Sequence, residues 1–500
     1  METQEIIDHF ERLRCTAKYP VFYLTGSAGT GKTYTIKQAI EQDSRFAQLA
    51  ASTGIAAVNL GTTTVNQVLK YFNTDSLLDA YQSGQLTMNL RKVRKFNRFL
   101  VIDEMSMIPY QQLDIFLWAL DEINNDVEDD ERLGLILVGD FAQLPPVPGN
   151  LIVAGKPVMT KDGQRNVKEP TPWAFKSELW SRFEEEGHII KLEKIYRQSD
   201  PTFLNGINAI RKGLGKSGVS YLAAAGVEFT RELDNYFDGT TIVGKNEEVD
   251  RINKIRLNQL EGKTQQLPST RWWAGEVLGW KQPSEWQYIP EQLELKLGAY
   301  VMILSNLKDP LTGRMEAANG DCGWVREITQ LKVPIYGEST YFDPNQPEVD
   351  HPPIIGEEIQ WVVRVELVRR PDELVTIPVV KRNIESRHDV DDVLKTHPKF
   401  NRDEAGNPKK IRNSMGRSVW CLGTIEYFPL RLAYATTTHK SQGLSLDRIQ
   451  IDPRGAFMGQ PAMCYVSLSR GRTPEGIKIV GSSSLFADRV KLDELVRRFV

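Results

Sequence analysis

The feature that most constrains this chain of 500 residues is the glycine-rich run GSAGTGKT. It consists of Gly26, Ser27, Ala28, Gly29, Thr30, Gly31, Lys32 and Thr33, and it lies between an apolar run (residues 21–24) and a segment with helical character. Glycines let backbone N–H groups approach phosphate oxygens, and the start of a helix favours negative charge. In this pattern Lys32 reaches the β- and γ-phosphates while the Thr33 hydroxyl binds Mg²⁺. A nucleoside triphosphate site is therefore predicted, because the full pattern arises by chance in only about 2% of chains this long.

Two more apolar runs, residues 99–102 and 133–138, alternate with polar helical stretches in the first 150 residues. Such alternation predicts a parallel α/β sheet. The first run ends at Asp103 and Glu104, and the second is followed by the loop 139–147, GDFAQLPPV, which contains Gln143. Because ligands of a parallel sheet bind beyond the carboxyl ends of its strands, we expect these clusters and the glycine-rich run to meet at one edge.

Three side chains of these clusters suit the hydrolysis of a magnesium-bound nucleotide. Asp103 is predicted to hold the metal ion, and Glu104 to activate the attacking water. The Gln143 amide is predicted to meet the γ-phosphate or that water. Taken alone, strand-end carboxylates are more often structural, and the loop 139–147 has the form of a proline-terminated turn. The glycine-rich run upstream favours the catalytic interpretation.

The composition is that of a multidomain globular protein, with 41% hydrophobic and 25% charged residues. A net charge of −3 argues against a protein that coats polyanions over its whole surface, but it leaves room for a local basic groove. The N-terminal residues are acidic and no apolar run approaches the ~18 residues of a membrane span, so neither export nor membrane insertion is signalled. Four cysteines without CxxC spacing favour an intracellular, cytoplasmic location.

Changes in character along the chain predict its domain organisation. Residues 1–190 are predicted to form a first α/β domain, in which the polar stretch at about 71–98 is a small inserted subdomain. A second α/β domain is predicted from residues 191–267 and 430–500. Between these two parts, residues 268–429 are β-rich and interrupted by prolines, which predicts an insert into the second domain.

Six motifs occur in the order of a known family. They are GSAGTGKT, VIDEMSMI, GDFAQLPPV, the YRQ of LEKIYRQSD, the HKSQG of TTHKSQGLSLD, and YVSLSRGRT. On these motifs the chain resembles the superfamily 1 helicases, and more narrowly their 5′→3′ branch, superfamily 1B, which contains RecD, Dda and the Pif-type enzymes. The resemblance implies an α/β fold with two RecA-like P-loop NTPase domains and a small β-rich SH3-like insert in the second.

The resemblance gives roles to residues that local pattern leaves open. Arg197 and Arg470 match arginines that point at the γ-phosphate, where a planar cation stabilises charge on the transferring group. Gln4 matches the glutamine that reads adenine, and Gln442 and Gly443 are expected near the nucleotide. The implied cofactors are ATP and Mg²⁺. The catalytic residues are then Lys32, Glu104, Gln143, Arg197 and Arg470, and the metal ligands are Thr33 and Asp103.

Two further segments, residues 53–57 and 61–66, resemble the strand-gripping motifs of the family. Together with the TTHKSQG segment, their implied DNA contacts are Thr53, Gly54, Thr64, Asn66, Thr437, Thr438 and His439. Small hydroxyl side chains and exposed backbone N–H groups suit phosphate contacts. Asn66 stands where the family usually has His, and an amide does not stack as an imidazole does. Residues 437–443 include both implied DNA contacts and residues expected near the nucleotide. This loop is therefore predicted to couple ATP hydrolysis to the binding of DNA.

Two features of the predicted insert leave two interpretations open. Residues 381–417 contain ten Lys and Arg against six Asp and Glu, which suits either phosphate contact or a solvated loop. Four tryptophans suit either base stacking or core packing. They are Trp272, Trp273, Trp280 and Trp286.

The resemblance implies an ATP-dependent DNA helicase that moves 5′→3′ along single-stranded DNA and unwinds duplex or forked DNA. Candidate protein partners are single-stranded-DNA-binding proteins and replication or recombination proteins, and no membrane partner is implied. One alternative is a RecD-like translocase subunit that needs partners. Another is an ATP-controlled nucleic-acid-binding switch without unwinding, which the two arginines and the DNA-gripping loop disfavour.

Overall fold

The computed structural model divides into two compact units, unit 1 (Met1–Val249 with Ala435–Val500) and unit 2 (Asp250–Tyr434). It describes residues 3–147, 149–150, 152–153, 156–157, 168–169, 171–283, 286–287, 289–305, 307–308, 315–317, 319–336, 354–368, 370–371, 373–386, 390–412 and 418–500. In this described part of the chain, no helix combines the length and the apolar character that crossing a membrane requires.

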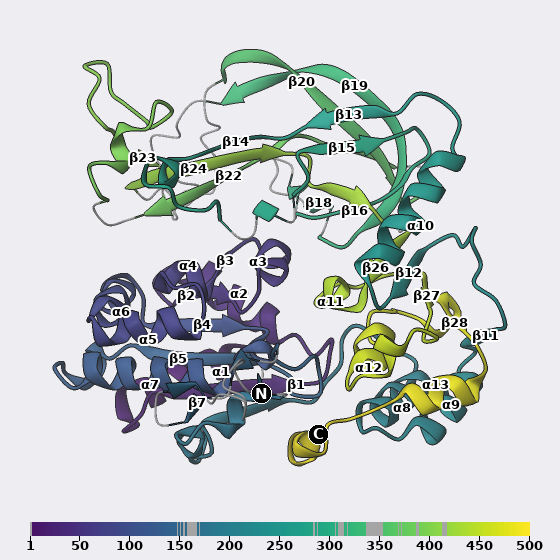
Figure 1. Ribbon diagram of the computed structural model, residues 1–500, viewed down its shortest axis with the longest axis horizontal. Helices are drawn as coiled ribbons and strands as arrows, with labels where there is room; N and C mark the ends of the chain where they lie inside the picture. Colours follow the sequence, from purple (N-terminus) through teal and green to yellow (C-terminus); the bar gives the residue numbers. More distant parts are fainter. Residues whose placement is uncertain are drawn as a thin grey trace. The chain divides into compact units, whose positions relative to one another are not determined.

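The first sheet of unit 1 has six parallel strands in the order β10-β1-β5-β4-β2-β3 (Figure 1). Their bounds are β1 Val21–Gly26, β2 Ala47–Ala51, β3 Thr63–Thr64, β4 Phe99–Asp103, β5 Gly134–Gly139 and β10 Ile189–Leu192. The three apolar runs of the sequence are the adjacent strands β1, β5 and β4, which confirms the predicted parallel α/β sheet. Pairing of Thr25 with Gly139, and of Asp103 with Val138, brings their carboxyl ends to one edge.

Helices cover both faces of this sheet. On one face Phe22 and Leu24 pack in a core with α1 (Thr3–Thr16) and α2 (Lys32–Gln42). On the other face Val21 and Tyr23 share a core with α5, α6 and α7. These helices span Thr74–Gln82, Gln85–Phe96 and Tyr110–Asn124. Because successive side chains of a strand point to opposite faces and both faces are buried, the central strands β1, β4 and β5 consist mainly of consecutive apolar residues.

The stretch predicted as an inserted subdomain, about 71–98, forms α5 and α6. Asn73 begins α5 with a capping box. Its side chain accepts from the Ser76 N–H, and the Ser76 side chain accepts from the Asn73 backbone N–H. Leu77, Leu86 and Leu90 are buried in the core shared with the first sheet. That this stretch forms a small inserted subdomain stays a prediction. Shorter elements of this half of unit 1 are α3 Gly54–Leu60, α4 Val65–Leu69, β6 Gly149–Asn150, β7 Ile152–Val153, β8 Lys156–Pro157 and β9 Lys168–Glu169.

The second sheet of unit 1 has five parallel strands in the order β11-β28-β27-β12-β26. Their bounds are β11 Glu228–Thr230, β12 Thr240–Val243, β26 Ala435–Thr437, β27 Ile449–Ile451 and β28 Ile477–Val480. Associated helices are α8 Pro201–Arg211, α9 Gly215–Ala224, α10 Asn246–Gln259, α11 Thr438–Ser441, α12 Met463–Leu468 and α13 Ser483–Arg489. In the sequence, β11 and β12 precede unit 2, and β26, β27 and β28 follow it. Unit 2 is therefore inserted in the sequence between the strands of this sheet.

Unit 2 is built from antiparallel strands, in keeping with the β-rich character of the predicted insert. The strands are β13 Gln265–Pro268, β14 Thr270–Trp273, β15 Gln292–Leu295, β16 Tyr300–Ile303, β17 Leu307–Lys308, β18 Met315–Ala317, β19 Cys322–Tyr336, β20 Ile354–Leu367, β21 Leu374–Ile377, β22 Val380–Ser386, β23 Ile411–Arg412, β24 Ser418–Tyr427 and β25 Leu430–Leu432. The longest pair, β19 with β20, joins β21, β16 and β25 in one sheet (Figure 1). The predicted domain bounds at residues 190, 267 and 430 stay predictions.

Candidate active site

The glycine-rich loop runs from the end of β1 to the start of α2, as the sequence pattern predicts. The Lys32 ammonium is buried and donates to the carbonyl oxygens of Gly26 (2.8 Å) and Ser27 (3.0 Å). Burial lowers its pKa, and the nearby carboxylates of Asp140 and Glu104 act in the opposite direction. The Lys32 ammonium therefore lies against the glycine-rich loop, where phosphate oxygens are expected to bind.

Two glycines of the loop are required by the close approach of neighbouring chain. Gly29 has φ 86°, and a Cβ there would lie 2.6 Å from the Cβ of Arg197. Gly26 has φ 150°, and a Cβ there would lie 2.4 Å from the carbonyl oxygen of Leu192. Side chains at either position would displace the loop or the segment packed on it. The loop is therefore shaped by contacts from residues 192–197 as well as by its own sequence.

Thr33 and Asp103 lie side by side at the carboxyl edge of the first sheet. The Thr33 hydroxyl donates to Asp103 Oδ2 at 2.7 Å, and Asp103 Oδ1 accepts the Glu104 backbone N–H at 2.7 Å. Burial raises the Asp103 pKa, against the effect of these hydrogen bonds. A hydroxyl and a carboxylate beside a phosphate loop are the oxygen donors that Mg²⁺ takes together with substrate phosphates. The residues therefore fit a magnesium-nucleotide.

Glu104 has a backbone conformation that the sequence did not indicate. Its φ of 53° is in the left-handed region, which non-glycine residues rarely adopt and which occurs most often at functional sites. The Ser52 hydroxyl donates to its carbonyl oxygen at 2.7 Å, and Gln442 Nε2 donates to its Oε2 at 2.7 Å. Burial, followed by the charge of Asp103, raises the Glu104 pKa. A carboxylate with a raised pKa suits proton abstraction near neutral pH.

The Gln442 amide joins two predicted site residues. Besides its bond to Glu104, Nε2 lies 3.2 Å from Gln143 Oε1, to which it donates. Gln143 and Gln442 are both buried. Gly443 follows with φ 80°, which turns the chain away from the site. The predicted base, the predicted phosphate-sensing amide and the loop that follows α11 thus form one hydrogen-bonded group.

Both predicted arginine fingers lie close to this group, with Arg470 buried and Arg197 partly buried. Arg470 is 1% exposed, and its Nε donates to the Val466 carbonyl oxygen at 2.8 Å. Arg197 Nη1 donates to the Ser469 carbonyl oxygen at 3.0 Å. Burial and then the charge of Arg470 lower the Arg197 pKa to about 9, whereas the Glu104 carboxylate acts to raise the pKa of both arginines. A buried and a partly buried guanidinium group near one carboxylate form a receptor for additional negative charge.

One buried network was missed by sequence reasoning. Asp140, directly after β5, forms an ion pair with Arg211 at the end of α8, and the Tyr465 hydroxyl of α12 also donates to Asp140. The same hydroxyl accepts the Ala28 N–H of the glycine-rich loop at 3.0 Å. Asp140 and Tyr465 stand inside motifs that the sequence already singled out, but nothing local pointed to Arg211.

Tyr196 was also quoted in a motif without a role. Its ring is 69% exposed, and a Cβ on Gly31 would lie 3.9 Å from it. An exposed aromatic face beside a phosphate loop is suited to stacking on a base. Gln4, by contrast, is exposed in the first turn of α1, where its amide donates to Asp8 on the same helix.

The residues expected to contact DNA lie at the carboxyl ends of β2, β3 and β26 and in the first turns of the short helices that follow these strands, α3, α4 and α11. Several of their hydroxyls make internal bonds: Thr53 caps the Ala56 N–H, Thr64 caps α4, Thr437 caps α11, and the buried Thr438 hydroxyl pairs with Ser467. Gly54 begins α3, and the Asn66 side chain donates to the Phe72 carbonyl oxygen. His439 is partly buried, which lowers its pKa. Their DNA contacts stay predictions.

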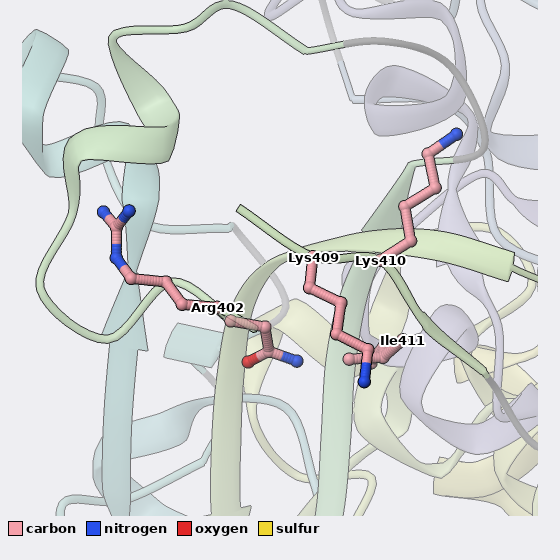
Figure 2. Close-up of a pocket in the computed structure, with 5 residues that line it drawn as sticks. Arg402, Lys409, Lys410 and Ile411 are labelled. Carbon is pink, nitrogen blue, oxygen red and sulfur yellow. The ribbon is translucent and has the colours of Figure 1, made fainter. Parts of the chain in front are cut away.

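The basic stretch of unit 2 contains a shallow hollow of about 260 Å³ (Figure 2). Its lining residues are Asn401, Arg402, Lys409, Lys410 and Ile411. Figure 2 shows the cationic ends of Arg402, Lys409 and Lys410 pointing in different directions. The Arg402 guanidinium donates to the carbonyl oxygens of Gly406 and Lys395. Diverging cations form no single anion cradle, so this hollow is a weaker candidate site than the carboxyl edge of the first sheet.

Most of the tryptophans in unit 2 pack against other side chains. Trp286 is buried, and Trp273 packs against it. Trp272 stacks on His397 with ring centroids 5.1 Å apart. Trp280 is half exposed. Core packing therefore accounts for three of the four rings, and Trp280 alone keeps an open face for stacking.

Comparisons with known proteins show what this chain is similar to. The family description "PIF1-like helicase" matches residues 1–214. A relative from a Psychrobacter species is named ATP-dependent DNA helicase Pif1. It is 28% identical over an alignment of 496 positions that covers 95% of this chain and 67% of that protein.

Two solved structures share the fold over the whole chain. A Bacteroides Pif1 in complex with ADP-AlF4 has a TM-score of 0.64 at 22% identity and covers 100% of this chain and 96% of its own. A Bacteroides Pif1 bound to ssDNA has a TM-score of 0.51 at 22% identity, with the same coverage. At these identities the likeness shows the fold, a mixed α/β architecture with two RecA-like domains.

Proposed function

Because the chain is a superfamily 1B helicase of the Pif1/RecD type, we propose that it moves 5′→3′ along single-stranded DNA and separates duplex and forked DNA. Its activity is that of an ATP-dependent DNA helicase. Mg²⁺ is proposed as the ion that accompanies ATP, and the Thr33 hydroxyl beside the Asp103 carboxylate supports it.

The observation that carries the proposal is the double hydrogen bond of the Gln442 amide. This side chain donates to Glu104 and to Gln143, at the centre of the expected hydrolysis site. The same short segment begins with Thr437, Thr438 and His439, the proposed DNA contacts at the end of β26. A change in charge or position at Glu104 is therefore transmitted over a few residues to the segment that grips DNA, which is the coupling a motor requires.

The side chains of the first sheet bind the nucleotide and prepare the water. When bound, magnesium-ATP supplies the phosphoryl group whose transfer to water drives movement. Lys32 and the amides of the glycine-rich loop bind phosphate oxygens, and Thr33 with Asp103 holds the ion. Glu104 takes the proton of the attacking water onto its carboxylate, which the Gln442 N–H keeps oriented.

The arginines of the second half of the site favour closure. Burying a guanidinium is costly until a counter-charge reaches it, and the lowered pKa values of Arg197 and Arg470 reflect that cost. A polyanion on the glycine-rich loop offsets this cost and draws the two parallel sheets together. Hydrolysis and release of phosphate remove the attraction, so the sheets reopen and one of them advances along the strand.

The proposed DNA contacts are tolerant of sequence. Backbone N–H groups and hydroxyls meet phosphates, which every sequence offers. Burial lowers the His439 pKa, so this ring is neutral at physiological pH and contributes shape and stacking rather than charge. Single-stranded-DNA-binding and replication or recombination proteins are proposed as partners that supply and protect the strand.

The test is strand separation by the purified chain on matched duplexes with a 5′ or a 3′ single-stranded tail, with ATP and Mg²⁺. The Lys32→Ala variant serves as the matched control without nucleotide chemistry. Opening of the 5′-tailed duplex alone, lost in the variant, is the expected result. Opening of the 3′-tailed duplex alone would overturn the direction, and ATP hydrolysis without opening of either would favour a partner-dependent translocase or a binding switch.

A further inference from the structure

The Asp140 carboxylate is held by four donors. Arg211 donates from Nε to Oδ2 at 3.1 Å and from Nη2 to Oδ1 at 2.8 Å. The Tyr465 hydroxyl donates to Oδ2 at 3.1 Å, and the Ala142 backbone N–H donates to Oδ1 at 3.0 Å. A carboxylate has about four acceptor positions, so this one is saturated. Asp140, Arg211 and Tyr465 are all buried, so water does not compete for these bonds.

The saturated carboxylate fixes the direction of a short hydrogen-bond chain. The Arg211 charge, acting against burial, holds the Asp140 pKa below its usual range, so the carboxyl is ionised and only accepts. The Tyr465 proton must therefore point to Asp140, which leaves the phenol oxygen free to accept the Ala28 N–H at 3.0 Å. The chain runs from the glycine-rich loop through Tyr465 to Asp140.

The same tyrosine lies next to the support of an arginine finger. Arg470 Nε donates to the carbonyl oxygen of Val466, the residue that follows Tyr465 in α12. Asp140 in turn lies three residues before Gln143, which the Gln442 amide contacts. The network thus joins the loop that binds phosphate, the helix that holds Arg470 and the strand end that carries Gln143.

We propose that Tyr465, anchored by the Asp140–Arg211 pair, is a positioning residue for ATP hydrolysis: it sets α12, and with it the Arg470 guanidinium, against the glycine-rich loop. The inference rests on the proposed function and adds to it a residue that acts through another. Asp140 and Arg211 hold the tyrosine, and Arg470 meets the reacting group. A misplacement of about 1 Å in a group such as the Arg470 guanidinium lowers a rate by about 100-fold, so the loss of one positioning hydroxyl is enough to slow the reaction.

A merely structural role gives a different signature. If the network only stabilised the fold, loss of the hydroxyl would lower the unfolding midpoint and leave the rate of the folded enzyme unchanged. If Tyr465 helped to bind nucleotide, its loss would raise the Kd. A positioning role lowers kcat of the folded enzyme while the Kd stays close to that of the unchanged chain.

The test uses Tyr465→Phe in the full chain, which keeps the ring and removes only the hydroxyl. Tyr427→Phe, a buried tyrosine in the core of unit 2, is the matched control. We expect kcat for DNA-stimulated ATP hydrolysis to fall by about tenfold or more in Tyr465→Phe and to stay within about twofold in the control. We expect faster hydrogen exchange at the Ala28 amide of the nucleotide-free protein, and a Kd for a fluorescent ATP analogue within about threefold.

Three results would overturn the proposal. The first is an unchanged kcat in Tyr465→Phe despite faster exchange at Ala28. The second is a loss of rate that is matched by a rise in Kd or by a loss of folded protein at the assay temperature. The third is the absence of ATP hydrolysis by the unchanged chain, in which case the proposed function fails as well; the first two outcomes leave that function standing. Arg211→Lys, which keeps the charge but not the two-point contact, is expected to retain part of the rate.

Discussion

The two faces of the nucleotide site are assembled in different ways. The binding face consists of residues 26–33 with Asp103 and Glu104. It comes from β1 and β4, parallel strands on either side of β5 whose ends the register brings together. The reading face comes from separate segments and consists of Arg197, Gln442, Tyr465 and Arg470. The two arginines donate to backbone carbonyl oxygens, whereas Gln442 and Tyr465 donate to the carboxylates of Glu104 and Asp140. Local pattern is therefore enough to build a nucleotide pocket, whereas the response to its contents depends on tertiary contacts. Substitutions on the two faces should fail in different ways.

The largest difference is expected from the arginines of the reading face. Arg470→Ala removes a guanidinium that we propose stabilises charge on the transferring group, so the hydrolysis rate should fall by about 10³-fold or more. Steady-state ATP hydrolysis with saturating single-stranded DNA measures it, with the unfolding midpoint as the control for folding. Arg470→Lys keeps the charge but loses the planar fork and should recover only part of the rate. A loss below about tenfold in Arg470→Ala would remove this residue from the reading face.

Loss of the predicted base on the binding face comes next. Glu104→Gln keeps the shape of the side chain but cannot take a proton, so kcat should fall by about 10²- to 10⁴-fold. The raised Glu104 pKa adds a prediction on pH. Because the base must be ionised, the unchanged chain should lose kcat as pH falls through that raised pKa, at a pH above the ordinary value of 4.5. A kcat that stays constant down to the ordinary value would show that Glu104 is not the base.

Gln442 connects the two faces, and its substitution should lower the rate of ATP hydrolysis by a smaller factor, which depends on DNA. Gln442→Ala leaves the Glu104 carboxylate and the Gln143 amide without their shared donor. A hydrogen bond to a buried charge contributes about 1.5–3 kcal/mol, which corresponds to about tenfold or more in rate. We expect stimulation by DNA to be lost to a greater degree than basal hydrolysis, measured as the ratio of the two rates. An equal loss in both rates would show that Gln442 serves only the binding face.

The smallest effect is expected from the basic hollow of unit 2. Lys409→Ala removes one of the diverging cations in Figure 2, and an exposed cation of this kind contributes at most about 1 kcal/mol to binding of a polyanion. ATP hydrolysis should be unchanged, and affinity for single-stranded DNA should change by less than about fivefold at physiological salt. A larger loss with a marked drop in salt dependence would make this hollow part of the DNA path.

The sequence was sufficient where a short pattern contains the whole constraint. Strand β1, the glycine-rich loop and α2 follow from one run of residues, and the apolar runs of β4 and β5 mark strands that are buried on both faces. The edge at which Asp103, Glu104 and Gln143 meet follows from the parallel order of those strands.

The sequence was insufficient where partners are distant or a residue adopts an unusual conformation. Asp140 and Arg211 are separated by 71 positions, and no local pattern distinguishes Arg211 from a surface cation. The left-handed backbone of Glu104 is imposed by its surroundings, not by its side chain. Thr64, Thr437 and Thr438 look like open hydroxyls in sequence, yet the fold buries all three and uses their oxygens in caps or in a pair with Ser467.

The division between the two faces is tested most directly by measuring nucleotide affinity and hydrolysis side by side in Lys32→Ala and Arg470→Ala. Titration of a fluorescent ATP analogue gives the Kd, and the same preparations give the rate. The account predicts that Lys32→Ala binds about 100-fold more weakly, because a phosphate contact of the binding face is lost. It predicts that Arg470→Ala loses much less affinity than Lys32→Ala and hydrolyses almost nothing. Equal loss of affinity in both variants would contradict the division and make the site a single binding surface.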